Sequence, residues 1–206
     1  MSADLTTDPT TDLLAIPGAS EAHLEMLRAR LATTAERDGL LDVAYRSIDS
    51  PLGSLLLAAT PAGLVRVAFE REDHDAVLAS LAEIVSPRVL RAPQRTDAVA
   101  RQLDEYFAGA RRTFDVADDL QLVHGFRRDV IEQLRRITYG TTQSYAAIAA
   151  ATGHPRAVRA VGSACAHNPV PVVVPCHRVV RSDGSIGQYL GGTDAKEALL
   201  ALEAAA

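Results

Sequence analysis

The hydrophobic pattern of this chain changes about halfway along it. Three short apolar runs, at residues 43–48, 54–59 and 64–69, are separated by turns that contain Pro and Gly. This spacing predicts an antiparallel meander, with helices after it near residues 75–85 and 97–108. From residue 126 onward the apolar residues recur with the period of a helix. The change predicts an α+β chain of two unlike domains: a small α/β domain at residues 41–115 and a mainly helical domain at residues 121–206.

The helical half contains a helix-turn-helix pattern. Phe126, Val130, Leu134 and Ile137 recur on one face of a first helix, which is expected to end at Tyr139-Gly140. Ser144 is a good N-cap for a short helix that extends to about residue 151. A turn at residues 153–155 leads to a second helix over about residues 156–167. That helix ends at Asn168, because a residue before proline disfavours the helical region. A last helix is expected at residues 194–203.

Residues 1–40 differ from the rest of the chain and are expected to form a flexible extension with one helix. Residues 1–18 are rich in Thr, Asp and Pro and are expected to be disordered. Ser20 is suited to cap one helix, which would stop near Gly39. We expect this helix to be solvated or only loosely docked.

Charge is distributed unevenly along the chain. The net charge is -5, yet residues 121–206 hold nine basic and six acidic side chains, a net charge of +3. The basic part is the part with the helix-turn-helix pattern, as contact with phosphates requires. So small a positive charge favours weak non-specific affinity for nucleic acid over a strong electrostatic clamp.

The chain has only two cysteines, Cys165 and Cys176. The N-terminal residues are acidic and polar and contain no apolar core segment, so no signal peptide is expected. No run approaches the roughly 18 apolar residues of a membrane span. Reduced thiols and a cytoplasmic, nucleoid-associated location are therefore expected, with no membrane partner. The cysteines are not clustered with histidines, so no metal site is predicted. Cys165, in the second helix of the pattern, is interpreted as a packed or half-exposed small residue and not as a second acceptor.

The segment with the clearest chemistry is Pro175-Cys176-His177-Arg178, which follows the apolar run at residues 170–174. A cysteine beside a histidine suggests a thiol that a neighbouring base makes nucleophilic. Adjacent side chains do not face the same way on a strand or a helix. We therefore expect a bridging water between Cys176 and His177 in place of a direct contact.

Several motifs in order and spacing extend this pattern over residues 126–203. They are Tyr139-Gly140, Ser144-Tyr145, Arg159-Ala160-Val161-Gly162, Asn168-Pro169, Pro175-Cys176-His177-Arg178, Gly191-Gly192, Lys196-Glu197, Leu199-Leu200 and Glu203. With them the chain resembles the O⁶-alkylguanine-DNA alkyltransferases, also called methylated-DNA–protein-cysteine methyltransferases. A weaker match reaches back to residues 49–53 and 103–109. The resemblance implies a ribonuclease-H-like N-terminal domain and a winged helix-turn-helix-like alkyltransferase domain.

The resemblance also implies roles for individual residues. Cys176 would accept the alkyl group, His177 would act as base through the water, and Glu203 would orient the imidazole. Tyr145 would assist departure of the guanine as a general acid. Asn168 would hold the turn that leads to the cysteine.

DNA contact would fall on the helix-turn-helix. Arg159 matches the arginine that fills the space of an everted base, and the helix would enter the minor groove. The accompanying positions are Ser144, Ala157, Ala160 and Gly162. The small residues fit close approach to DNA and packing of one helix on another equally well. The base pocket would be lined by Val179, Tyr189 and Leu190, where Leu190 replaces the small residue common in the family.

The implied function is direct reversal of DNA damage. A monomer would move a methyl or larger alkyl group irreversibly from O⁶-alkylguanine, or O⁴-alkylthymine, in duplex DNA to Cys176, without a cofactor. Two alternatives are a non-catalytic sensor of alkylated bases and a DNA-binding regulator. The sensors that resemble this family lack the cysteine, and a regulator leaves the Cys-His-Glu set unexplained.

Overall fold

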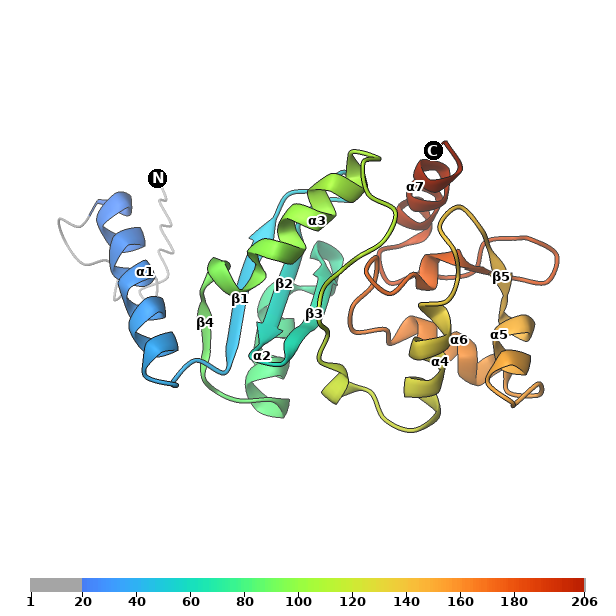
Figure 1. Ribbon diagram of the computed structural model, residues 1–206, viewed down its shortest axis with the longest axis horizontal. Helices are drawn as coiled ribbons and strands as arrows, with labels where there is room; N and C mark the ends of the chain where they lie inside the picture. Colours follow the sequence, from blue (N-terminus) through green and yellow to red (C-terminus); the bar gives the residue numbers. More distant parts are fainter. Residues whose placement is uncertain (1–19, 206) are drawn as a thin grey trace, which may run out of the picture.

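The computed structural model describes residues 20–205 of the 206-residue chain. The predicted disorder of residues 1–18 lies outside these described residues. A sheet flanked by helices and a cluster of short helices lie side by side in the molecule (Figure 1). The predicted fold class, an α/β unit followed by a mainly helical unit, is confirmed.

The three predicted strands form the antiparallel part of the sheet. They are β1 (Val43–Ile48), β2 (Leu55–Thr60) and β3 (Gly63–Phe69). A fourth strand, β4 (Val89–Arg91), was not predicted; it pairs parallel with β1 and completes the order β3-β2-β1-β4. Three residues are too few to show an alternating pattern, so only the pairing with β1 reveals β4 as a strand.

Two helices cover the opposite faces of the sheet. Alternate residues of β2 face opposite sides: Leu57 packs in one core with Leu103 and Tyr106 of α3 (Asp97–Phe107), and Ala58 packs in another with Leu81 of α2 (His74–Ile84). Short 3-10 turns precede both helices, η2 (Glu70–Glu72) before α2 and η3 (Pro93–Thr96) before α3. With helices on both faces of the sheet, every residue of β2 is buried.

The outer edge of β3 is covered by the chain that leads into the helical unit and by the segment that follows α6 (Val158–Ala166). The Leu64 amide donates to Ala117 O at 2.9 Å, and the Val67 amide donates to Pro169 O at 2.8 Å. Gly63 allows this approach, because a Cβ there would lie 2.5 Å from Ala117 O. One hydrophobic core is continuous from β2 and β3 into the helical unit. The two units are therefore joined by backbone pairing and by a shared interior.

The helical unit contains α4 (Phe126–Leu134), α5 (Tyr145–Ala151), α6 (Val158–Ala166) and α7 (Thr193–Ala204), with η4 (Leu120–Leu122) before them. The helix-turn-helix pattern corresponds to α5 and α6. The helix that begins at Phe126 ends at Leu134, although Ile137 is still buried in the turn that follows. A two-stranded parallel pair of β5 (Gln143–Ser144) and β6 (Val179–Val180) was not predicted. It ties the start of α5 to the residues just after Cys176.

The N-terminal helix α1 (Glu21–Arg37) is docked on the β4 edge of the sheet. Only Ala32 and Ala35 of this helix are buried, in a small cluster with Leu41, Ala44 and Ala92. Ion pairs join Glu36 to Arg95 and Glu25 to Arg91. Met26, Leu27 and Leu31 on its outer side are exposed. The contact is narrow. The Glu25–Arg91 pair is exposed, whereas Arg95 is largely buried beneath Glu36.

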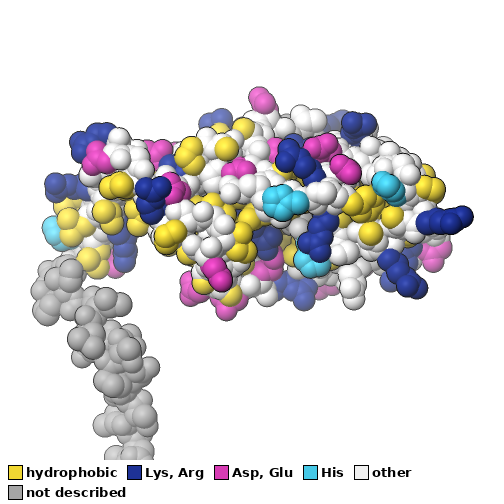
Figure 2. Space-filling view, turned by 90° about the horizontal axis from the view of Figure 1, so that it is seen from below, with side chains coloured by type: hydrophobic (Ala, Val, Ile, Leu, Met, Phe, Trp, Pro, Cys, Tyr) yellow, Lys and Arg dark blue, Asp and Glu magenta, His cyan; other side chains and the backbone are white. Residues whose placement is uncertain are grey.

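Basic side chains project from the end of the molecule that the helical unit forms, with few acidic side chains among them on the face in Figure 2. This agrees with the net charge of +3 over residues 121–206. Within residues 20–205, no helix combines the length and the apolar character that crossing a membrane requires.

Candidate functional site

Asn168 fixes the loop that presents Cys176. Its Oδ1 accepts from the Val170 amide at 3.1 Å, and its Nδ2 donates to Val174 O at 2.9 Å. The same Nδ2 lies 3.1 Å from Cys176 Sγ. The apolar run is a tight turn, with Val172 in the left-handed region at φ 71°. A β-branched residue there is strained, and the buried amide of Asn168 helps to hold it.

Cys176 begins the short turn η5 (Cys176–Arg178) and exposes 1% of its surface. Burial raises the pKa of its thiol to about 11, while the hydrogen bond from Asn168 and the charge of Lys196 act in the opposite direction. The sulfur is therefore protonated at neutral pH and needs a base to become a nucleophile. Cys165 is also a free thiol, and burial raises its pKa further.

His177 is fully buried and its ring is held at one nitrogen. Nε2 lies 2.8 Å from Glu203 Oε1. An ionised carboxylate can only accept a hydrogen bond, so Nε2 carries the proton and Nδ1 is the basic nitrogen. Among the described residues Nδ1 has no hydrogen-bonding partner, and no hydrogen bond joins His177 to Cys176. Burial lowers the pKa of His177, although Glu203 opposes the shift. The imidazole is thus neutral and has a free lone pair.

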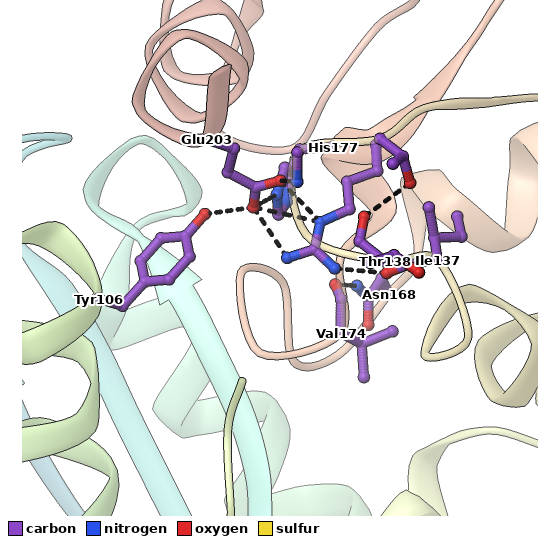
Figure 3. A network of polar contacts seen from close by, with 10 residues as sticks. Tyr106, Ile137, Thr138, Asn168, Val174, His177 and Glu203 are labelled. Carbon is purple, nitrogen blue, oxygen red and sulfur yellow. Dashed lines mark hydrogen bonds and ion pairs between the residues drawn. The ribbon is translucent and has the colours of Figure 1, made fainter. Parts of the chain in front are cut away.

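Glu203 is the centre of a buried polar network (Figure 3). Besides His177, its carboxylate accepts from Arg178 Nε at 2.9 Å, from Tyr106 Oη at 2.7 Å and from the Gly140 amide at 3.1 Å. Burial alone would raise the pKa of Glu203, but the hydrogen bonds from His177 and Arg178 lower it to about 2. The carboxylate is therefore ionised over the whole neutral range.

Two members of this network have no role in the sequence prediction. Arg178 is buried and also donates from Nη1 to Ile137 O at 2.6 Å, which ties Glu203 to the turn after α4. Tyr106 comes from α3 of the sheet unit. The position of Arg178 next to His177 in the sequence was a signal that Arg178 belongs to the network. The sequence carried no such signal for Tyr106, because its partner Glu203 is 97 residues away.

Tyr145 is the first residue of α5 and lies close to the site. Ser144 caps that helix, its Oγ accepting from the Ala147 amide at 3.1 Å. The pKa of Tyr145 is raised to about 12, mainly by burial; negative charge on Cys165 or Cys176 acts in the same direction. A Cβ added to Gly187 would lie 2.5 Å from the Tyr145 hydroxyl oxygen. The loop after β6 thus covers this hydroxyl, and Gly187 is a close contact that sequence reasoning missed.

The outer face of α6 is made of the predicted DNA-contact residues. Arg159 and Ala160 are exposed, whereas Val161, Ala164 and Cys165 on the other side are buried. Nothing lies within 4 Å of a Cβ added to Gly162. Close packing on a neighbouring helix therefore does not explain this glycine. Ala157, just before α6, is half-buried.

The predicted pocket residues lie beside the reactive pair. Val179 is buried next to η5. The Tyr189 ring packs edge-on against Phe69 of β3 at 5.6 Å and against His177 at 6.3 Å between centroids. Leu190 is half-buried against the same core. The loop over the site therefore rests on a side chain of the sheet unit. Within residues 20–205, no group of three or more His, Cys, Asp and Glu side chains is placed to hold a metal ion.

Two family models match the chain. Residues 43–120 match the ribonuclease-like domain of 6-O-methylguanine DNA methyltransferase, and residues 125–205 match its DNA binding domain. A methylated-DNA–protein-cysteine methyltransferase from Mycolicibacterium paratuberculosis is 40% identical over 161 residues, which cover 78% of this chain and 92% of that protein. The constitutive methylated-DNA–protein-cysteine methyltransferase of Bacillus subtilis is 38% identical and is covered to 94%.

Solved structures agree with these matches. The O6-methylguanine methyltransferase of Mycobacterium tuberculosis superposes with a TM-score of 0.70 and 38% identity, covering 79% of this chain and 93% of that one. A structure of the M. tuberculosis protein in complex with DNA gives a TM-score of 0.68.

Proposed function

The chain belongs to the 6-O-methylguanine DNA methyltransferase family, and on that premise we propose that it repairs DNA by moving an alkyl group onto Cys176. The partner is duplex DNA that carries O⁶-alkylguanine, and the working form is a monomer. The observation that supports Cys176 as acceptor is the buried chain of contacts behind it. Asn168 contacts its sulfur, and Glu203 holds the adjacent imidazole in the basic tautomer.

The first step is removal of the thiol proton. Nδ1 of His177 takes the proton of Cys176 through a water molecule, and the imidazolium that forms is stabilised by Glu203. Because Glu203 is already ionised, it orients and stabilises the ring and does not itself take up the proton. The Asn168 amide stabilises the thiolate by a hydrogen bond to Sγ.

The second step is displacement at carbon. The thiolate attacks the alkyl carbon, an S–C bond forms, and the C–O⁶ bond breaks with its electron pair on guanine. Tyr145 donates its hydroxyl proton to the departing base, which is restored to guanine. The tyrosinate then regains a proton from solvent, and the His177 imidazolium releases to solvent the proton that it took from Cys176. The sulfur ends as a neutral thioether that has no route back to the thiol. Each molecule therefore acts once.

Access to the base requires eversion from the duplex. The exposed side of α6 enters the minor groove, where Ala160 and Gly162 allow close approach and Arg159 occupies the vacated space. Arg159 makes no hydrogen bond or ion pair with any described residue, so its guanidinium is available for the orphaned base. Eversion costs a few kcal/mol, less at a mispaired lesion.

The test is incubation with duplex DNA that carries one O⁶-methylguanine. We expect the peptide that contains Cys176 to gain the mass of one methyl group, with a stoichiometry of one per chain. The Cys176→Ser variant should bind the same DNA without any mass change. Binding by the wild-type protein without mass gain would overturn the proposal and favour a sensor or a regulator.

A further inference from the structure

Lys196 is the only lysine in this chain. The chain has 21 Lys and Arg residues, and all of them except Lys196 are arginine. Lys196 lies in α7 and is fully buried, one of the largest side chains with no exposed surface. A chain that uses arginine everywhere else has a lysine at this one interior position. This points to a requirement for a compact ammonium that a planar guanidinium does not meet.

The surroundings of Lys196 place its ammonium in the wall of the reactive site. Nζ donates to Val179 O at 2.5 Å, and it lies 5.9 Å from the centroid of the Tyr145 ring. Val179 follows η5, and Tyr145 begins α5, the two elements that the β5–β6 pair joins. Lys196 thus contacts both segments that carry the proposed chemistry.

Among the described residues no carboxylate forms an ion pair with Lys196. The other buried cation of the site, Arg178, is paired with Glu203 at 2.9 Å. A buried charge without a partner destabilises the fold, so its presence in a site indicates a functional role. The groups around Lys196 that can become negative are Cys176 of η5, Cys165 of α6 and Tyr145 of α5, whereas Arg181 adds positive charge.

We infer that Lys196 is a positioning residue for the Cys176 thiolate. Its buried ammonium compensates the negative charge of the ionised sulfur, and it fixes the Val179 carbonyl beside the base pocket. The inference rests on the proposed function, because only a sulfur that ionises during the reaction needs such a charge. The ammonium keeps its protons throughout. The thiol proton still goes to His177, and the alkyl group goes to sulfur.

The electrostatics of both partners agree with this placement. Burial lowers the pKa of Lys196, and negative charge on Cys176 would raise it again. Reciprocally, the charge of Lys196 lowers the pKa of the buried Cys176 thiol. The two charged forms therefore favour each other.

The first test compares alkyl transfer by the wild type, Lys196→Met and Leu199→Ala from pH 6 to pH 12, because the pKa of the Cys176 thiol is about 11. Methionine keeps the length of the side chain without its charge. Leu199 is buried in the same helix, so Leu199→Ala loses packing without loss of charge. We expect Lys196→Met to move the alkaline midpoint of the transfer rate upward by about one pH unit, which is about a tenfold slower rate at pH 7. The midpoint of Leu199→Ala should stay in place. Equal midpoints in all three proteins would refute the inference.

A second test needs no folded Lys196 variant and no DNA. Selective ¹³C labelling at the lysine ε-carbon gives one NMR signal, because the chain has one lysine. We expect this signal to show a charged ammonium at pH 7 and to titrate at lower pH in Cys176→Ser than in the wild type. A neutral amine at pH 7, or identical titration curves, would overturn the role of Lys196. Neither result affects the proposed function, which fails instead if wild-type Cys176 never gains the alkyl group.

Discussion

Tyr106 donates a hydrogen bond to Glu203 with an Oη to Oε1 distance of 2.7 Å, across 97 residues of sequence. One residue lies in α3 of the sheet unit and the other in α7 of the helical unit. Both side chains are buried. The carboxylate that orients His177 is therefore held from the sheet unit as well as from its own. The N-terminal half of the molecule is part of the support of the reactive site.

Replacing Tyr106 by Phe removes this donor and leaves the ring in place. A hydrogen bond to a charged group contributes about 1.5–3 kcal/mol, and a buried carboxylate oxygen would lose one of its partners. We expect Tyr106→Phe to lower the free energy of unfolding by about this amount and to slow alkyl transfer several-fold, as measured by single-turnover kinetics on duplex DNA. Tyr139→Phe is the matched control, since the Tyr139 hydroxyl is buried without a partner. Equal losses in both variants would contradict the role of Tyr106.

The ionisation of Glu203 predicts a specific loss of stability in acid. Its pKa is about 2 in the folded protein, against 4.5 ordinarily. A carboxyl with a depressed pKa stabilises the fold fully above its ordinary pKa, and that contribution disappears as pH falls from about 4.5 to 2.

Glu203→Gln removes this titration and leaves Arg178 buried without an anion. Loss of one partner of a buried ion pair costs about 3–5 kcal/mol. Urea unfolding should therefore show a wild type that is clearly more stable than the variant at pH 6, with a smaller difference at pH 3. A difference that does not change between the two pH values would show that Glu203 is not the titrating group.

Arg159→Ala separates base eversion from chemistry. The side chain is exposed on α6 and makes no contact with the sulfur. Transfer from methylated duplex DNA should fall at least tenfold, because loss of the filling side chain leaves the eversion cost of a few kcal/mol without compensation. Transfer from the free alkylated base should change little. Arg156→Ala is the control for general charge, since Arg156 is exposed in the turn just before α6. Equal loss on duplex and free base would rule out a role in eversion.

Removal of residues 1–40 should leave alkyl transfer intact. Helix α1 buries only Ala32 and Ala35 against the sheet edge, far along the sheet from the helical unit (Figure 1). Its loss uncovers Ala44 and Ala92, so we expect a decrease of a few degrees in Tm by calorimetry. A truncated protein that is folded and inactive would show that the extension contributes to the site.

Local pattern predicted the elements that depend on neighbours along the chain. The alternation of apolar runs and turns predicted β1, β2 and β3, and Ser144 predicted the start of α5, because periods and caps are set within a few residues. The three-residue β4 and the β5–β6 pair carry too little local pattern, and their partners are distant. The predicted continuation of the first helix to Ile137 was wrong. Ile137 lies in a turn and is buried by the tertiary fold, and an apolar residue at that position is also what a longer helix would require.

By itself the sequence determined which residue types are present and in which order: a thiol beside an imidazole, a helix-turn-helix before them and a carboxylate near the end. Only the tertiary structure decided which groups lie around that thiol and its base. Tyr106, Arg178 and Lys196 reach the site through contacts of 17 to 97 residues in sequence separation. Such contacts arise from burial in a common core, where removal from water makes each charge depend on a partner that chain order does not specify.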